Sequence, residues 1–354
     1  MKKQPKVGPK ILAPLLVLAS LGVAVTGCNG PNSRLTTEHS KIISNKSSNV
    51  YPVSKTGLYF DTVITVTLYE YTGSSDDIFK ETFEICDTYE KMLSSTVEGS
   101  DIWNINHSGG SPTTVSPDTA KLLERALYYC ELSNGKLDIT LGDISKQWNF
   151  SENAGLDSPI LPSDEVINEL LKAANYHNIT IDGQEVTLSN PETSIELGFI
   201  AKGYIADRLY DYLKNIGVTS AIINLGGNVK VVGSKPDGTA FKIGIQKPFA
   251  DMGETFTVVD ISDSSVVSSG VYERYFNYDG KLYHHILDPK TGYPYETDIL
   301  SASIKTNSST DADALSTLCF ILGPDAGIEL IESLENTEVM YITNNYEMFV
   351  SSGW

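Results

Sequence analysis

Residues 196–207 read ELGFIAKGYIAD, and this stretch predicts a crossing from a strand into a helix. Glu196 ends the strand, Gly198 follows it, and Lys202 falls in the first turn of the helix. Unpaired backbone N–H groups at a helix start suit a phosphate or another anion. A lysine there opposes the helix dipole, so its charge either serves a ligand or lies at the surface beside a packing Gly203. Both interpretations remain open from this stretch alone.

Helices and strands interleave without strict alternation on both sides of this crossing. Because several strands follow one another as hairpins, the order favours an α+β fold over a doubly wound parallel sheet. We expect one mixed domain over residues 51–354, built as a single body or as two coupled lobes. The patterns predict helices over 77–93, 116–132, 163–175, 200–216, 311–322 and 327–334, and strands over 62–69, 221–225, 230–232, 241–246, 256–261, 302–306, 339–342 and 348–350.

The first 50 residues have the composition of a targeting segment. Four lysines precede an apolar run over 11–25, which is shorter than the roughly 20 residues of a membrane span. The chain then reads VTGC over 25–28, which resembles the bacterial lipobox. We therefore expect a lipoprotein signal peptide over 1–27, a lipid on Cys28 and attachment to the extracytoplasmic face of the cell membrane. Residues 28–50 read as a flexible polar tether. The alternative is an uncut membrane anchor.

The charge balance limits the possible partners. The chain has 26 basic and 45 acidic residues, a formal net charge of −19, and four of the basic residues belong to the leader. Nucleic-acid affinity rests largely on Lys and Arg that neutralise phosphates, so we expect no nucleic-acid partner. A metal ion or a helix terminus can still hold a phosphate locally. Cys86, Cys130 and Cys319 lie in apolar segments without metal-ligand spacing, and we expect them to be buried and reduced.

Three further stretches cluster small and polar residues between structured segments. Residues 224–228, NLGGN, suit either the close approach of another group or a tight hairpin turn. Residues 268–275, SSGVYERY, suit either a cradle for a ring or phosphate or a strand-end turn. His284 and His285 precede a turn and are either an acid–base group or a structural pair. A zinc site would need more ligands at suitable spacing than these two histidines.

Residues 311–317, DADALST, could open a helix. In that case Asp313 and Thr317, four residues apart, share one face. Two oxygen ligands one turn apart suit Mg²⁺, which fills the rest of its shell with water and phosphate oxygens. The alternative is that Asp311 or Asp313 caps the helix while Thr317 bonds back to a carbonyl.

Taken in order, these stretches resemble the motifs of the ApbE family, the FAD:protein FMN transferases. The resemblance covers nearly the whole chain after residue 50. Each motif is short, and their shared order carries the resemblance. Phe199 and His284 depart from the small residue and the serine that many members have there, and Leu137 and Leu141 are apolar replacements. The matching segments are 60–63, 99–106, 136–142, 196–207, 223–228, 268–275, 285–292 and 312–317.

The resemblance implies a role for individual residues. Asp313 and Thr317 would hold Mg²⁺ together with a backbone carbonyl at Phe199, and His285 would be the catalytic histidine, with Asp313 also required for catalysis through the metal. The residues implied to contact FAD are Phe60, Ile102, Leu137, Asp138, Ile139, Glu196, Lys202 and Val271.

The implied reaction moves FMN from FAD to a Thr or Ser hydroxyl of an acceptor redox protein and releases AMP. Three alternatives remain open. Water could replace the acceptor, which would make the protein an FAD pyrophosphatase. The protein could also bind flavin or another solute without catalysis, or be a structural surface lipoprotein. The combination of Asp313, Thr317 and His285 favours an enzyme, because binding alone does not need it.

Overall fold

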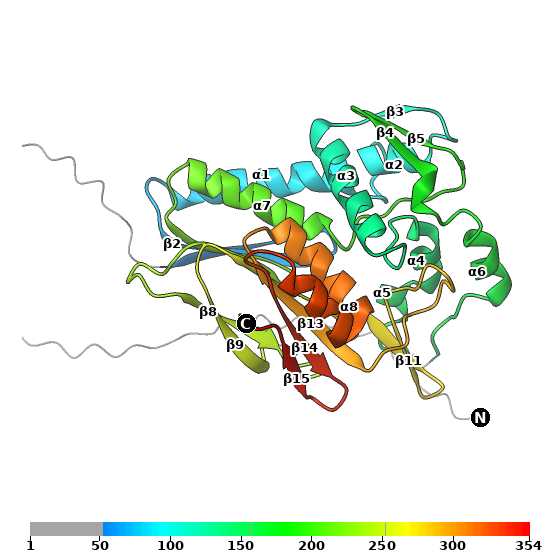
Figure 1. The fold of residues 1–354 in the computed structure, drawn as a ribbon. Coiled ribbons are helices and arrows are strands. Elements are labelled where there is room, and N and C mark those ends of the chain that lie inside the picture. Colours follow the sequence, from blue (N-terminus) through cyan, green and yellow to red (C-terminus); the bar gives the residue numbers. More distant parts are fainter. Residues whose placement is uncertain (1–51, 157, 252) are drawn as a thin grey trace, which may run out of the picture. The chain divides into compact units, whose positions relative to one another are not determined.

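The main sheet joins strands from both ends of the described part of the chain (Figure 1). A computed structural model describes residues 52–156, 158–251 and 253–354. Eight strands lie in the order β1-β2-β6-β7-β10-β13-β14-β15, and every neighbouring pair is antiparallel. Their bounds are β1 Val53–Tyr59, β2 Thr62–Glu70, β6 Ser220–Leu225, β7 Asn228–Gly233, β10 Ser265–Gly270, β13 Ile299–Thr306, β14 Glu338–Thr343 and β15 Met348–Val350.

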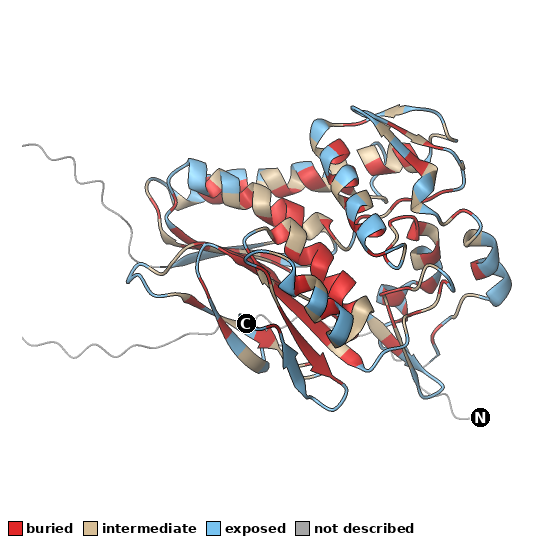
Figure 2. Ribbon diagram, viewed as in Figure 1, coloured by how far each residue is buried: buried red, intermediate tan, exposed pale blue. Residues whose placement is uncertain are grey.

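Three helices pack against this sheet on one side: α1 (Ser75–Leu93), α7 (Ala201–Asn215) and α8 (Ser309–Glu332). Ser308 caps α8, because its hydroxyl accepts a hydrogen bond from the N–H of Asp311 (3.1 Å). Gly323 breaks the helical path with φ 76° and ψ 174°, and Pro324 follows it. Although α8 is long and apolar enough for a membrane span, its first half is buried in this domain (Figure 2).

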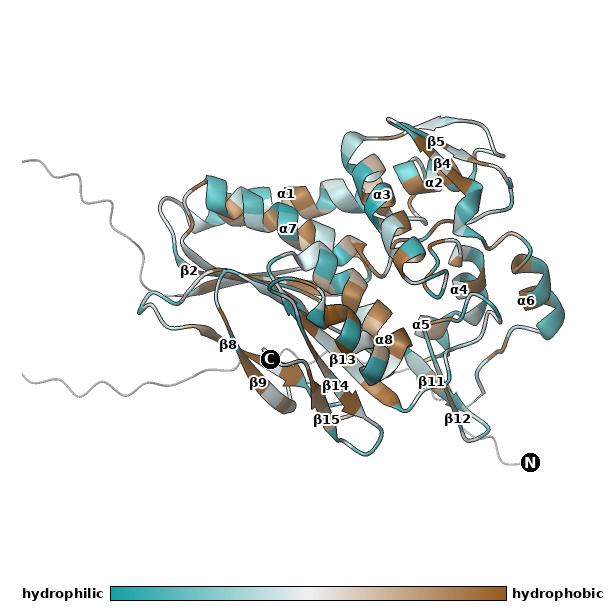
Figure 3. Ribbon diagram, in the orientation of Figure 1, coloured by the Kyte–Doolittle hydropathy of each residue, from teal (hydrophilic) through white to brown (hydrophobic). Residues whose placement is uncertain are grey.

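A hairpin covers part of the opposite face of the sheet. It consists of β8 (Phe241–Gln246) and β9 (Thr255–Ile261), and its inward residues include Phe241 and Ile261. They pack against Val231 of β7 and Ile342 of β14 in a second, smaller core. The central strands β7, β10, β13 and β14 are therefore largely buried, whereas β1 and β15 at the two edges of the sheet are largely exposed. Hydrophobic residues colour much of β13 and β14 in Figure 3.

The remaining elements form what we call the cap, which lies beside α8 and the first turns of α7 in Figure 1. A core of its own, around Trp148, Phe150 and Phe276, holds part of the cap together. Its elements are α2 Asp101–Asn106, β3 Thr113–Thr114, α3 Pro117–Leu132, α4 Gly142–Trp148, α5 Phe150–Asn153, α6 Asp164–Leu170, the 3₁₀ helix Tyr176–Asn178, β4 Ile179–Asp182, β5 Glu185–Leu188, β11 Tyr275–Tyr278 and β12 Lys281–His284.

Most of the expected elements are confirmed. The sheet with its helices is an α+β fold, and residues 52–354 belong to one compact unit. The strands over 241–246 and 348–350 match β8 and β15 at both ends. The helix expected over 163–175 is wrong in length, since α6 ends at Leu170. Cys86, Cys130 and Cys319 are buried and free, as expected. The signal peptide, Cys28 and the tether lie outside the described residues.

Candidate active site

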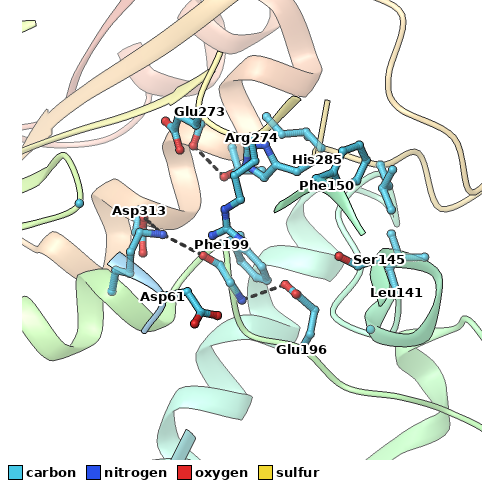
Figure 4. A pocket seen from close by; sticks show the side chains of 18 of the residues that line it. Asp61, Leu141, Ser145, Phe150, Glu196, Phe199, Glu273, Arg274, His285 and Asp313 are labelled. Carbon is cyan, nitrogen blue, oxygen red and sulfur yellow. Dashed lines mark hydrogen bonds and ion pairs between the residues drawn. The ribbon is translucent and has the colours of Figure 1, made fainter. Parts of the chain in front are cut away.

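A cavity of about 300 Å³ lies between the sheet with its helices and the cap. One side, which we call the sheet wall, includes Lys202 of α7, Asn228 of β7, Ser269 of β10, and Asp313 and Thr317 of α8. The opposite side, the cap wall, consists of Leu141, Ser145, Lys146, Asn149 and Phe150 from α4, α5 and the residues around them. Figure 4 shows Asp313 and Leu141 on opposite sides of this cavity.

Asp313 is the most deeply buried acid of the cavity, with 3% of its surface exposed. The N–H of Gly203, in the first turn of α7, donates a hydrogen bond to its Oδ2 (2.9 Å). A side chain on Gly203 would place Cβ 2.2 Å from the carbonyl oxygen of Ser309, so glycine is needed for α7 to approach α8. The ELGFIAKGYIAD stretch therefore contains the first turn of α7, and an N–H group of this turn orients the Asp313 carboxylate of α8.

Thr317 lies one helical turn beyond Asp313 on the same face of α8, as the four-residue spacing predicts. Its hydroxyl is hydrogen-bonded to that of Ser269 (3.0 Å), which also bonds Ser316 (2.7 Å). The alternative interpretation of this helix start is wrong, because Ser308 provides the cap. Asp311 instead accepts hydrogen bonds from Arg125 (2.6 Å) and from Tyr129 (2.9 Å). Asp311 and Asp313, the two acids of the DADALST stretch, thus have different surroundings.

Lys202 and Glu196 lie on either side of a tight backbone turn. The ammonium group of Lys202 donates to the carbonyl of Gly198 (3.1 Å) and lies 3.9 Å from Oδ1 of Asp313. Oε1 of Glu196 accepts a hydrogen bond from the N–H of Gly198 (2.9 Å). The positive charge of Lys202 is therefore held at the Asp313 end of the cavity, where it can meet an anionic ligand. Figure 4 shows Asp313 and Glu196 on the same side of the cavity.

The two histidines have different surroundings. His284 is 3% exposed; its Nδ1 accepts a hydrogen bond from Ile286 N–H (3.3 Å), so its Nε2 carries the proton and donates to the carbonyl of Tyr295 (2.9 Å). His285 lines the cavity, and its buried Nδ1 has no partner. Burial, with smaller contributions from Arg274, His284 and Lys202, lowers the pKa of His285 to about 3. His285 is thus neutral near pH 7 and has a free nitrogen lone pair.

Comparison with known proteins identifies the family. The sequence pattern of the ApbE family matches residues 60–341. The chain belongs to the ApbE family. The FAD:protein FMN transferase of Klebsiella pneumoniae (strain 342) is 35% identical over 273 residues, which span 76% of this chain and 83% of that protein. The FAD:protein FMN transferase of Treponema pallidum (strain Nichols) is 32% identical over 324 residues, which span 86% of this chain and 88% of that protein.

Solved ApbE structures share the fold. The ApbE protein of Thermotoga maritima superposes with a TM-score of 0.77 at 27% sequence identity, covering 85% of this chain and 97% of that one. The flavin transferase ApbE of Vibrio cholerae gives a TM-score of 0.75 at 25% identity, with the same coverage. The resemblance noted in the sequence motifs is thus confirmed as membership of the family.

The residues implied by the ApbE motifs divide into two groups. Leu137, Asp138, Glu196, Phe199, Lys202, His285, Asp313 and Thr317 all line one cavity. The structure does not place the side chains of Phe60, Ile102, Ile139 and Val271 among the residues that line it. Ile102 and Ile139 have no exposed surface, and Val271 has 3%. Phe60 packs against the main core, while Asp61, the next residue, lines the cavity.

Some ApbE motif residues have structural contacts instead. Asp207, the last residue of the opening stretch, accepts hydrogen bonds from the N–H groups of Ser309 and Thr310 (2.9 Å each). It thereby fixes the start of α8. Gly292 has φ 70°, and its carbonyl accepts a hydrogen bond from the buried indole of Trp148 (2.7 Å). This contact joins the turn after His285 to α4 of the cap.

Several cavity residues were not predicted as site residues. Glu273 and Arg274 lie beside His285, although their SSGVYERY stretch had been noted as a possible cradle (Figure 4). Desolvation raises the pKa of Glu273 to about 7, Asp313 adds to this, and Lys202 and Arg274 oppose it. Glu273 lines the cavity and keeps part of its surface exposed.

The donor set suits Mg²⁺ better than zinc. Within the described residues, no group of three or more His, Cys, Asp and Glu side chains could hold a metal ion. Asp313, Thr317 and the Phe199 carbonyl are all oxygen donors, as Mg²⁺ prefers. In a regular helix the N–H of Gly203 would bond the carbonyl of Phe199, but it donates to Asp313 instead. The Phe199 carbonyl therefore receives no hydrogen bond from Gly203, which fits a role as a metal ligand.

Proposed function

We propose that this chain is a Mg²⁺-dependent FAD:protein FMN transferase. A Thr or Ser hydroxyl of an acceptor protein attacks the FMN-side phosphorus of FAD, forming a phosphoester bond. The pyrophosphate bond breaks, and AMP leaves with the bonding electrons. Membership of the ApbE family supports FMN transfer. One observation of the site carries the proposal furthest: a buried, oriented carboxylate, Asp313, shares a cavity with Lys202 and a neutral His285.

The residues of this chain have different roles in the proposed reaction. Asp313, Thr317 and the Phe199 carbonyl would hold Mg²⁺, which neutralises charge on the phosphate oxygens when it is bound. Lys202 adds a fixed positive charge near the same oxygens. His285 is neutral because its pKa is low, so it can accept a hydrogen bond from the attacking hydroxyl and orient its oxygen towards the phosphorus, while the proton passes to water. Glu196 and Leu137 line the cavity where they can contact FAD.

The test is a transfer assay with purified protein, FAD, Mg²⁺ and a candidate acceptor redox protein. Mass spectrometry should detect the mass of FMN added to the acceptor, and EDTA should abolish the addition. A parallel reaction without acceptor measures AMP release by water. If AMP appears at the same rate with or without acceptor and no acceptor is modified, the protein is a pyrophosphatase. Full transfer in EDTA would overturn the metal assignment.

We also propose that the mature protein is attached to the membrane by a lipid on Cys28. The basic start, the short apolar run and the VTGC sequence support this proposal. Cells grown with labelled palmitate should incorporate label into the wild-type protein. The Cys28→Ala variant should contain no label. A labelled variant would contradict the attachment site.

A further inference from the structure

Two buried polar atoms of the cavity have no partner. In the part of the chain that the structure describes, six buried side-chain nitrogen or oxygen atoms lack a hydrogen bond. Only two of them belong to residues that line the cavity: Nδ1 of His285 and Nδ2 of Asn228. Burying an amide donor without a partner costs about 1–3 kcal/mol, so an unpartnered atom on a residue that lines a ligand cavity suggests that the ligand completes its bonding.

The position of Asn228 is fixed by its neighbours. It is 1% exposed and begins β7, directly after the turn of Gly226 and Gly227, whose φ angles are 59° and 97°. Asn224 holds this turn, because its Oδ1 accepts a hydrogen bond from the N–H of Gly227 (2.9 Å). Gly226 packs closely on Thr62 of the neighbouring strand, where a Cβ would lie 2.2 Å from the hydroxyl oxygen. The turn therefore cannot shift easily, and Asn228 is held in place.

Asn228 also contacts the helix that carries Asp313. The hydroxyl of Ser309 donates to Oδ1 of Asn228 (2.7 Å), and Ser309 in turn is bonded to Ser265 (3.0 Å). Ser309, Asp313 and Thr317 are spaced by four residues, so they follow one face of α8. The Asn228 amide is thus about one helical turn from the carboxylate of Asp313. Rotating the amide by 180° would leave its oxygen unpartnered instead, so one polar atom lacks a partner in either orientation.

We propose that Asn228 binds the pyrophosphate of FAD through its Nδ2 hydrogens. This inference rests on the proposed function, since it takes FAD as the ligand. Nδ2 is a donor, and the Asp313 end of the cavity is where phosphate oxygens are expected from Lys202 and the oxygen ligands of α8. A donor with fixed geometry beside a phosphate oxygen forms a charge-assisted hydrogen bond. Asn228 is then a substrate-binding residue that selects for the phosphate portion of the flavin.

The test compares FAD with riboflavin, which has no phosphate. Binding is measured by the quenching of flavin fluorescence, in EDTA so that no turnover occurs, and again with Mg²⁺. The Asn228→Asp variant keeps an oxygen for Ser309 and replaces the donor by an acceptor. We expect its FAD affinity to fall about 10- to 100-fold, with riboflavin affinity changed less than about threefold. Asn228→Ser, which has a shorter side chain, should show a smaller loss in the same direction.

Asn224→Ala is the matched control, because Asn224 belongs to the same turn but does not line the cavity. It should lower the melting temperature without changing the preference for FAD over riboflavin. Equal FAD binding by the wild type and Asn228→Asp would overturn the inference, as would tighter FAD binding by the variant in Mg²⁺. A parallel loss of FAD and riboflavin binding would also overturn it, since that indicates a structural role. A wild type that fails to bind FAD would contradict the proposed function itself.

Discussion

The sheet wall and the cap wall of the cavity are built in different ways. On the sheet wall, Asp313 and Asn228 are almost fully buried and are held by hydrogen bonds from other elements. On the cap wall, Lys146 is exposed and bonds only Asp143, three residues away on the same short helix. Buried groups that are held by hydrogen bonds suit chemistry that needs fixed geometry, whereas exposed groups can adapt to a ligand. Substitutions on the two walls should therefore have different effects.

The largest effect is expected at Asp313. Asp313→Asn removes a charge that the metal site needs, so FMN transfer should fall at least about 10³-fold while the melting temperature changes little. Asp311→Asn is the matched control, because Asp311 is bonded to Arg125 and Tyr129 and does not line the cavity. It should lower stability but keep transfer near the wild-type rate. Similar activity losses in both variants would contradict the separate roles.

A second test is the contact between α7 and α8. Gly203→Ala would place Cβ 2.2 Å from the Ser309 carbonyl and 2.8 Å from Cβ of Asp313. The two helices must separate, so the free energy of unfolding should fall by about 2–3 kcal/mol, and the rate of FMN transfer should fall as well. Gly217→Ala, at the other end of α7 with φ 83°, has no close neighbour and should cost only about 1 kcal/mol. Urea unfolding and the transfer assay measure both effects.

A third test uses pH. Burial lowers the pKa of His284 to about 4, against about 6.5 in the unfolded chain. Below pH 6.5 the unfolded state therefore takes up a proton that the folded state does not, and stability falls as the pH drops towards 4. At pH 5 the loss from His284 is about 2 kcal/mol. Urea unfolding of His284→Gln should show a correspondingly smaller drop between pH 7 and pH 5. An equal drop in both proteins would contradict the assignment.

The smallest effect is expected on the cap wall. Lys146→Ala removes an exposed charge from the cavity, so the KM for FAD should rise a few-fold while kcat stays near the wild-type value. Asp143→Ala breaks the same ion pair but does not line the cavity, and it should leave the KM unchanged. Exposed pairs of this kind contribute about 0–1 kcal/mol to stability, so both variants should fold normally. A large kcat loss in Lys146→Ala would mean that the two walls do not differ as described.

The sequence predicted the sheet wall much better than the cap wall. The spacing of Asp313 and Thr317 suggested a shared helix face, and glycines with Lys202 suggested a helix start, but both patterns left structural alternatives open. The shared order of the ApbE motifs decided between them. Asn228 was noted only as part of a turn, because its missing partner is a property of the folded chain. Apart from Leu141, the cap wall was missed, since α4 has no side-chain cap and only seven residues. β1 was missed because it is largely exposed and does not alternate.

The first half of α8 has a consequence for mutational tolerance. Every residue from Ala312 to Phe320 is buried, and the positions not facing the cavity contact the sheet, α7 or each other. A helix enclosed on all sides has no face on which substitutions are neutral. A scan of all single substitutions should therefore show a continuous intolerant block over 312–320. Beyond the break at Gly323, where Gly327 and Ile331 are buried and Asp325 and Glu329 are exposed, tolerance should instead vary with the helical repeat.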